Sequence, residues 1–171
     1  MGVGMLDDED KKDLMEAFDD LRVELESCIS EIIDSPGDAT NSQLNRLFRA
    51  IHTVKGNAGL MGVSPVVEFS HAIEELASAL RKRTITLTEL IAETLLIAMD
   101  RLHDIHEKEL YDKHFEHLRI DELKTLYHAL AIAETDEADG MAMQILQLLG
   151  AGIADGVPNH SIILRTTSTG S

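Results

Sequence analysis

The 171-residue sequence predicts an all-α protein: an antiparallel up-and-down four-helix bundle with an additional helical hairpin towards the C-terminus. Apolar residues recur at three- and four-residue spacing, which on a helix of about 3.6 residues per turn forms one buried stripe. Aromatic residues make up only 4% of the chain and Trp is absent, a composition that favours helices over sheets. Four amphipathic helices joined by short turns fold most simply as a bundle.

The first helix is expected over residues 8–34, where acidic residues at 7–10 suit a helix N-terminus. Its apolar seam alternates four and three residues apart, at Leu14, Phe18, Leu21, Leu25, Cys28 and Ile32. Ser35-Pro36-Gly37-Asp38 then interrupts the chain. The second helix is expected to begin with Asn41 or Ser42 as its cap and to end in the glycine-rich stretch that closes at Gly62.

Ser64 followed by Pro65 predicts the cap and first residue of a third helix. The stretch from Thr86 to Glu89 has the form of a capping box and predicts a fourth helix. Two shorter helices, from Asp121 and over residues 137–149, are expected to form a hairpin docked on the bundle. The chain is thus expected to consist of a bundle over residues 1–118, a hairpin over 119–150 and a disordered tail over 151–171.

The residues that could take part in a reaction are concentrated in the second helix. His52 is turned roughly 90° from the centre of the apolar stripe, where an imidazole is half supported and half open to solvent. Gly56 and Gly59 follow on that flank. A glycine inside a helix lowers its stability by about 1 kcal/mol relative to alanine, so the two glycines indicate that open space is required there. Lys55 can place its ammonium over this space. Room and positive charge beside an imidazole suit a phosphoryl group, whereas His52 alone is typical of a solvated surface residue.

The wider motif resembles a known family. His52-x-x-Lys55-Gly56 followed by Gly62, and preceded by Phe48-Arg49-Ala50, is similar to the signature of histidine-containing phosphotransfer (Hpt) domains. Among these, it most resembles the N-terminal phosphotransfer domain of CheA-type chemotaxis histidine kinases. The likeness in helix pattern extends from about Leu6 to about Leu110.

The resemblance implies roles for particular residues and partners. His52 would be the phosphoacceptor, and Glu74 on the third helix would accept a hydrogen bond from Nδ1 and leave Nε2 as the nucleophile. His71 would lie nearby and tune the local charge. The phosphoryl group would come from a histidine kinase catalytic domain or a receiver domain, and would pass to the aspartate of a response-regulator receiver domain. The chain would then be a phosphocarrier rather than an enzyme, either free-standing or part of a longer kinase.

Composition restricts the other possibilities. The formal charge of −16 disfavours nucleic acid or an anionic membrane as a partner. The single cysteine fits a reducing compartment, and no run approaches the roughly 20 apolar residues of a membrane span. The sequence carries no nucleotide-binding motif, and no cofactor is expected. A cytoplasmic monomer is therefore predicted.

Two alternative functions are compatible with parts of the sequence. A histidine-rich segment carries His103, His106, Glu107, His114 and His117, and Glu68-x-x-His71 has the spacing of helix-bundle di-metal sites. Such a site needs a second Glu-x-x-His motif, and the histidines flank a helix end where imidazoles are expected to face water, so no functional metal is predicted. The other alternative is a helical interaction module that binds a response regulator or a kinase without carrying phosphate.

Overall fold

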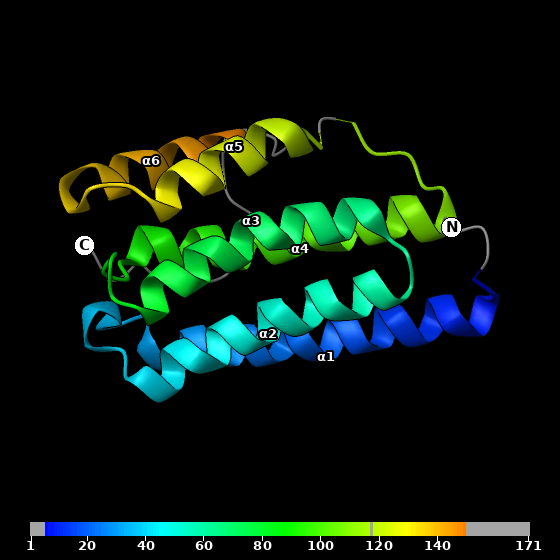
Figure 1. The fold of residues 1–171 in the computed structure, drawn as a ribbon, viewed down its shortest axis with the longest axis horizontal. Coiled ribbons are helices and arrows are strands. Elements are labelled where there is room, and N and C mark those ends of the chain that lie inside the picture. Colours follow the sequence, from blue (N-terminus) through cyan, green and yellow to red (C-terminus); the bar gives the residue numbers. More distant parts are fainter. Residues whose placement is uncertain (1–5, 117, 150–171) are drawn as a thin grey trace.

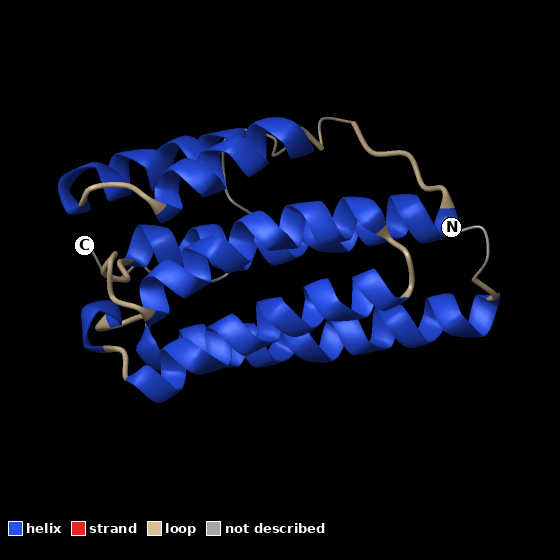
Figure 2. Ribbon diagram, in the orientation of Figure 1, coloured by secondary structure: helices blue, strands red, loops and turns tan. Residues whose placement is uncertain are grey.

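The computed structural model describes residues 6–116 and 118–149. Within these ranges the chain is helical and contains no strand, which confirms the all-α fold class (Figure 2). The helices are α1 (Asp8–Ile32), α2 (Asn41–Leu60), α3 (Ser64–Arg81), α4 (Glu89–Tyr111), α5 (Ile120–Ala131) and α6 (Thr135–Leu149), with a 3-10 turn, η2 (Pro36–Asp38), between α1 and α2. None of the helices in the described ranges is both long and apolar enough to cross a membrane.

The helices are arranged in three layers of two (Figure 1). Helices α1 and α2 form one outer layer, α3 and α4 the middle layer, and α5 and α6 the other outer layer. The first four helices form the predicted bundle, and the α5–α6 hairpin packs on α3 and α4, so the docked hairpin is confirmed. The division of the chain at residues 118 and 119 stays a prediction, and the expected tail over 151–171 lies outside the described residues.

Helix α4 lies in the middle of this arrangement. Residues 91–99 are all buried, and all of them except Glu93 and Thr94 are apolar. The phenol of Tyr127 on α5 is fully buried and donates a hydrogen bond of 2.6 Å to the carbonyl oxygen of Thr94 on α4. The hairpin therefore shares the hydrophobic core of the bundle, and one buried hydrogen bond fixes its position on α4.

The first two helices begin with reciprocal capping boxes. Asp7 and Asp10 close the start of α1, in agreement with the acidic cluster there. At α2 the cap is Thr40, whose hydroxyl accepts from the Gln43 amide while the Gln43 side chain accepts from the Thr40 amide. The expected cap at Asn41 or Ser42 was wrong, because only Thr40 has a matching partner three residues later. Helix α1 ends at Ile32, two residues before the expected end.

The starts of α3 and α4 also differ from expectation. Ser64 is the first helical residue of α3 and Val63 is the cap, because a two-residue turn after α2 leaves no room for a longer entry. At α4 the cap is Thr88, which accepts a hydrogen bond of 3.2 Å from the Ile91 amide, so the box expected at Thr86 is absent. Leu87 is buried, which keeps the chain extended across the end of the bundle until residue 88.

Candidate functional site

The turn between α2 and α3 determines which residues face each other across these helices. Gly62 has a φ of 74°, a backbone conformation that glycine adopts without a Cβ clash. The amide of Val63 donates to the carbonyl oxygen of Ala58 at 2.9 Å and closes the end of α2. The chain reverses within these residues, and α3 returns antiparallel to α2. His52 of α2 therefore lies opposite Glu74 of α3.

Glu74 holds two of the sequence-predicted site residues. Its Oε2 is 2.6 Å from Nδ1 of His52, and its Oε1 is 2.7 Å from Nζ of Lys55. The Glu74 side chain is 13% exposed, whereas the His52 side chain is 59% exposed. Because a carboxylate accepts hydrogen bonds, this contact favours the tautomer in which Nδ1 carries the proton. Nε2 then keeps its lone pair on the exposed imidazole.

The charge of Glu74 follows from two opposing effects on its pKa. Partial burial raises the pKa of the carboxyl, and the hydrogen bonds from Lys55 and His52 lower it. The hydrogen bonds prevail, so the pKa lies below its ordinary value of 4.5. Glu74 is therefore an anion at neutral pH and can offset positive charge on the His52 ring.

An aromatic and a cationic side chain lie next to His52. The ring of Phe48 stacks on the imidazole with centroids 5.7 Å apart and planes inclined by 13°. On Phe48 itself lies Arg81 of α3, with Cζ 3.8 Å from the ring centroid. The sequence motif included Phe48 without assigning it a role, and Arg81 was not predicted. The only sequence signal was the four-residue spacing between Phe48 and His52.

The two glycines differ in their surroundings. A Cβ added to Gly56 would meet nothing within 4 Å, so the surface beside it is open, in line with the space expected near the imidazole. A Cβ added to Gly59 would lie 3.9 Å from Cγ2 of Val67 on α3. Gly59 therefore lies close to the neighbouring helix, and the open space is at Gly56.

The contacts of His71 are with Glu75 on its own helix and with the docked hairpin. Its Nε2 is 3.2 Å from Oε1 of Glu75, and its ring meets that of His128 on α5 edge to face at 6.3 Å. His128 also pairs with Glu75 through Nδ1. Glu74 contacts His52, whereas the contacts of His71 lie towards the hairpin, and its influence on the charge at His52 stays a prediction.

The histidine-rich segment does not assemble as the metal alternative requires. His106 is buried against Phe18 with ring centroids 4.6 Å apart, and its Nδ1 is 2.8 Å from the carbonyl oxygen of Leu102. Burial lowers its pKa to about 4, so this imidazole is neutral at pH 7. The sequence analysis expected it to face water, and this expectation was wrong. Glu68 lies 3.9 Å from Lys124. In the described ranges, which leave out His117, no three histidine, cysteine or acidic residues gather as potential metal ligands.

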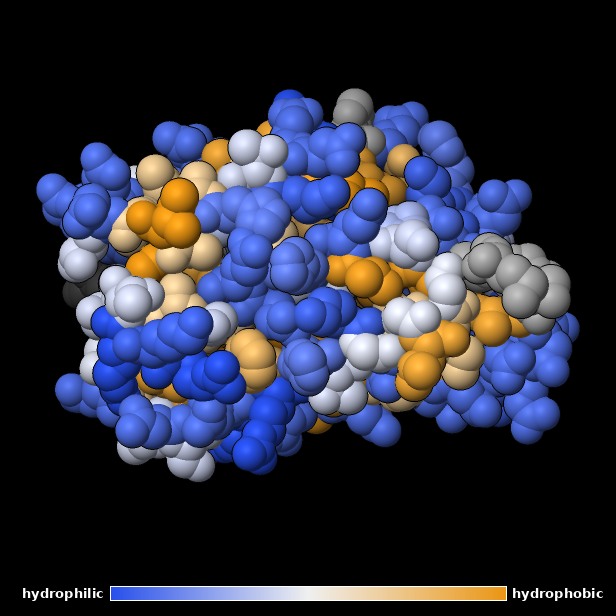
Figure 3. All heavy atoms as spheres, in the orientation of Figure 1, coloured by the Kyte–Doolittle hydropathy of each residue, from blue (hydrophilic) through white to orange (hydrophobic). Residues whose placement is uncertain are grey.

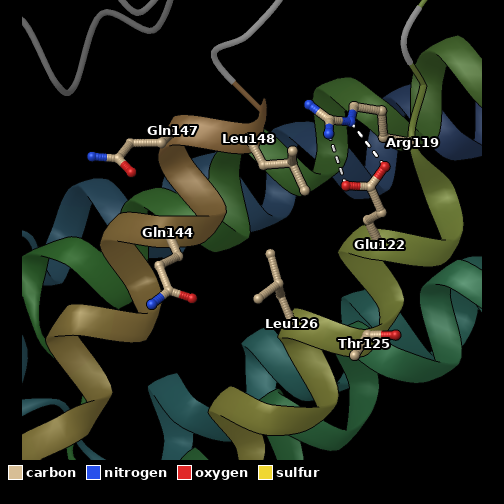
Figure 4. A pocket seen from close by; sticks show the side chains of 7 residues that line it. All are labelled: Arg119, Glu122, Thr125, Leu126, Gln144, Gln147 and Leu148. Carbon is tan, nitrogen blue, oxygen red and sulfur yellow. Dashed lines mark hydrogen bonds and ion pairs between the residues drawn. The ribbon is translucent and has the colours of Figure 1, made fainter.

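A separate groove lies on the hairpin between α5 and α6 (Figure 4). Its volume is about 530 Å³, and Leu126 of α5 and Leu148 of α6 line it from the two helices. Its charged residues, Arg119 and Glu122, pair with each other at 2.8 Å. The remaining lining residues are Thr125, Gln144 and Gln147. The groove contains no nucleophile or unpaired charge comparable to the site around His52.

An exposed imidazole on a helical bundle, with a carboxylate on one ring nitrogen and a cation nearby, is the arrangement that the sequence resemblance implied for His52. Comparison with known proteins identifies the family, because the model of the Hpt domain matches residues 12–105. The chain belongs to the Hpt domain family, and the resemblance seen in the sequence is confirmed. Hpt domains are phosphocarriers of two-component signalling rather than catalysts.

The relatives extend well beyond the region they share with this chain. The chemotaxis protein CheA of Rhizobium meliloti (strain 1021) is 28% identical over 135 residues, which cover 79% of this chain and 17% of that protein. CheA of Cereibacter sphaeroides is 32% identical over 101 residues, or 56% of this chain and 15% of that protein. The gliding motility regulatory protein of Myxococcus xanthus is 29% identical over 98 residues, which cover 57% of this chain and 12% of that protein. The chain therefore spans less than a fifth of the length of these relatives.

Proposed function

We propose that His52 is the phosphoacceptor of this module and carries the phosphoryl group on Nε2. The observation that supports this most is the position of Glu74, which binds Nδ1 of His52 with one oxygen and Lys55 with the other while the imidazole remains exposed. The Nε2 lone pair attacks phosphorus, and the bond from phosphorus to the oxygen of the leaving group breaks. The ring becomes positively charged as the P–N bond forms, and the carboxylate of Glu74 stabilises that charge.

Lys55 and Gly56 fit the incoming group. A phosphoryl group brings negatively charged oxygens that need both room and a compensating cation. The surface at Gly56 is open, and the ammonium of Lys55 is held 2.7 Å from Glu74, one helical turn from His52. A small movement of the flexible lysine side chain places its charge against the phosphoryl oxygens. Lys55 is therefore proposed to stabilise the phosphorylated state.

The partners supply the rest of the chemistry. We propose that the phosphoryl group comes from the catalytic domain of a histidine kinase or from a phosphorylated receiver domain, and passes to a receiver aspartate. The kinase supplies the nucleotide and its Mg²⁺, and the receiver has a Mg²⁺ site of its own. The similarity to CheA proteins supports a chemotaxis-type pathway in the cytoplasm, with this chain acting as a monomeric phosphocarrier.

A phosphotransfer assay tests the proposal. The full chain is incubated with a chemotaxis-type histidine kinase and γ-labelled ATP, and the label is challenged with acid and with alkali. We expect acid-labile, alkali-stable label on the wild type and on His128→Gln, and none on His52→Gln. Circular dichroism is expected to show the same helicity and melting for all three proteins. Label that persists on His52→Gln would overturn the assignment.

A second candidate function is an interaction module that binds a kinase or response regulator without phosphate. Leu60, at the end of α2 beyond His52 and the glycines, is 87% exposed. This exposed leucine, about two helical turns beyond His52, offers apolar surface for contact with a partner. Binding of a receiver domain to the wild type, with no label transferred in either direction, would favour this function.

A further inference from the structure

A basic surface lies beside the site in an otherwise acidic protein. It consists of Arg49 on α2, Arg81 at the end of α3, and Lys82 and Arg83 directly after it. In the described part of the chain, none of these four side chains has a carboxylate oxygen within 4.0 Å. Much of the most hydrophilic surface in Figure 3 lies at the lower left, over the end of the molecule where α2 begins and α3 ends.

Several other arginines are neutralised by neighbours. Arg46, one helical turn before Arg49 on α2, pairs with Glu24 of α1 at 2.9 Å and with Glu31 of α1 at 2.6 Å. Arg22 pairs with Glu26 and Asp100. With 31 acidic and 15 basic residues in the chain, four cations without acidic partners in one region leave a local positive field on a molecule of net charge −16.

The basic surface is continuous with the site. Arg81 covers one ring neighbour of His52, since its guanidinium lies over Phe48, which stacks on the imidazole. Arg49 precedes His52 by one helical turn and is exposed. Arg83 donates to the carbonyl oxygen of Ala39 at 2.8 Å and connects the end of α3 to the start of α2. A partner that approaches His52 therefore also meets this surface.

We propose that this basic surface docks the acidic face of the receiver domain that exchanges phosphoryl with His52. The inference rests on the proposed function. A receiver presents its phosphoacceptor aspartate among carboxylates that hold Mg²⁺, so its reacting face is acidic. The net charge of −16 repels such a face from most directions, whereas the four cations attract it beside His52. Charge complementarity thus orients the receiver aspartate towards the phosphohistidine.

The test removes charge without removing structural contacts. Arg81 and Arg83 contact Phe48, Ala39 and Asn41, so they stay in place. The test variant is Arg49→Gln/Lys82→Gln, because both side chains are exposed and form no hydrogen bond or ion pair within the described residues. The matched control is Lys12→Gln/Lys108→Gln, which removes the same charge from exposed positions on α1 and α4.

Each protein is first phosphorylated with phosphoramidate, a small donor that needs no docking surface. It is then mixed with a purified chemotaxis-type receiver domain and Mg²⁺, and the second-order rate constant of transfer is measured from about 20 mM to about 500 mM salt. We expect Arg49→Gln/Lys82→Gln to be slower than wild type by at least about threefold at low salt, and to match it at high salt. The control variant is expected to follow the wild type.

The outcomes separate this inference from the proposed function. Equal rates for the test and control variants at low salt, or a deficit of the test variant that persists at high salt, would overturn the docking surface and leave His52 as phosphoacceptor. Failure of phosphoramidate to label any of the proteins at His52 would overturn the proposed function and the docking surface together.

Discussion

One buried carboxyl on α4 is expected to contribute strongly to the pH dependence of stability. Glu93 is 4% exposed, and neither of its side-chain oxygens has a hydrogen-bond partner in the described residues. Burial, with a smaller contribution from the charge of Glu89, raises its pKa from 4.5 to about 7. Between these values the folded state holds a proton that the unfolded state has lost. The free energy of unfolding therefore falls as pH rises from 4.5 to 7.

The size of this effect follows from the two pKa values. At 1.36 kcal/mol per pKa unit, the rise from 4.5 to about 7 corresponds to about 3 kcal/mol. About 2 to 3 kcal/mol of this loss falls between pH 5 and pH 8, a range that lies above the pI of about 4.7. Glu93→Gln keeps the shape of the side chain and removes its titration. The stability of the wild type relative to this variant should therefore decline by that amount over the range.

Urea denaturation followed by circular dichroism measures the prediction at a series of pH values. Carboxyl groups common to both proteins cancel in the difference, which isolates Glu93. Glu9→Gln, at an exposed position in the first turn of α1, serves as the control and should run parallel to the wild type. Parallel wild-type and Glu93→Gln curves from pH 5 to pH 8 would refute the reasoning, because Glu93 would then titrate alike in the folded and unfolded states.

Two further predictions concern the site. Glu74→Gln should slow phosphorylation of His52 by about tenfold to a hundredfold, because no carboxylate then fixes the tautomer of the ring or offsets its charge. Glu75→Gln, which removes the neighbouring carboxylate, should not slow it. Equal rates for the two variants in a kinase assay would show that Glu74 has no role in the site. Gly56→Ala should stabilise the protein by up to about 1 kcal/mol, because the added Cβ meets nothing within 4 Å, yet should slow phosphotransfer by filling space for the phosphoryl group. Melting and transfer rates measured on the same preparation test both effects, and an unchanged transfer rate would argue against a role for Gly56.

The helices could be predicted from sequence more securely than their starts. Apolar stripes persist over many turns, so a local irregularity does not hide them. A helix start depends on one hydroxyl among several nearby, and at α4 the burial of Leu87 selected Thr88 over Thr86. At α2, Gln43 selected Thr40 over its neighbours. Tertiary packing set the start of α4, and one capping partner set the start of α2. A pattern of apolar residues reports neither of these.

Parts of the candidate site were predictable for a similar reason. His52 and Lys55 are one turn apart on one helix, and the family motif pointed to Glu74 on the next. The contact between Arg81 and Phe48 depends on how α3 is rotated against α2, which no local spacing reports. The ring contact of His71 with His128 likewise depends on how the hairpin docks on α3, which the sequence pattern does not report.

Helix α3 connects the candidate site with the hairpin through two adjacent residues. Glu74 faces α2 and holds His52, and Glu75 faces α5 and pairs with His128, because successive residues on a helix point about 100° apart. The hairpin packs on α3 and α4 and leaves the other outer layer, α1 and α2, open to solvent on its far side. An addition to the bundle on α2 would have covered the imidazole. Packed on the middle layer, the hairpin buries apolar surface of α3 and α4 and leaves His52 accessible to a partner.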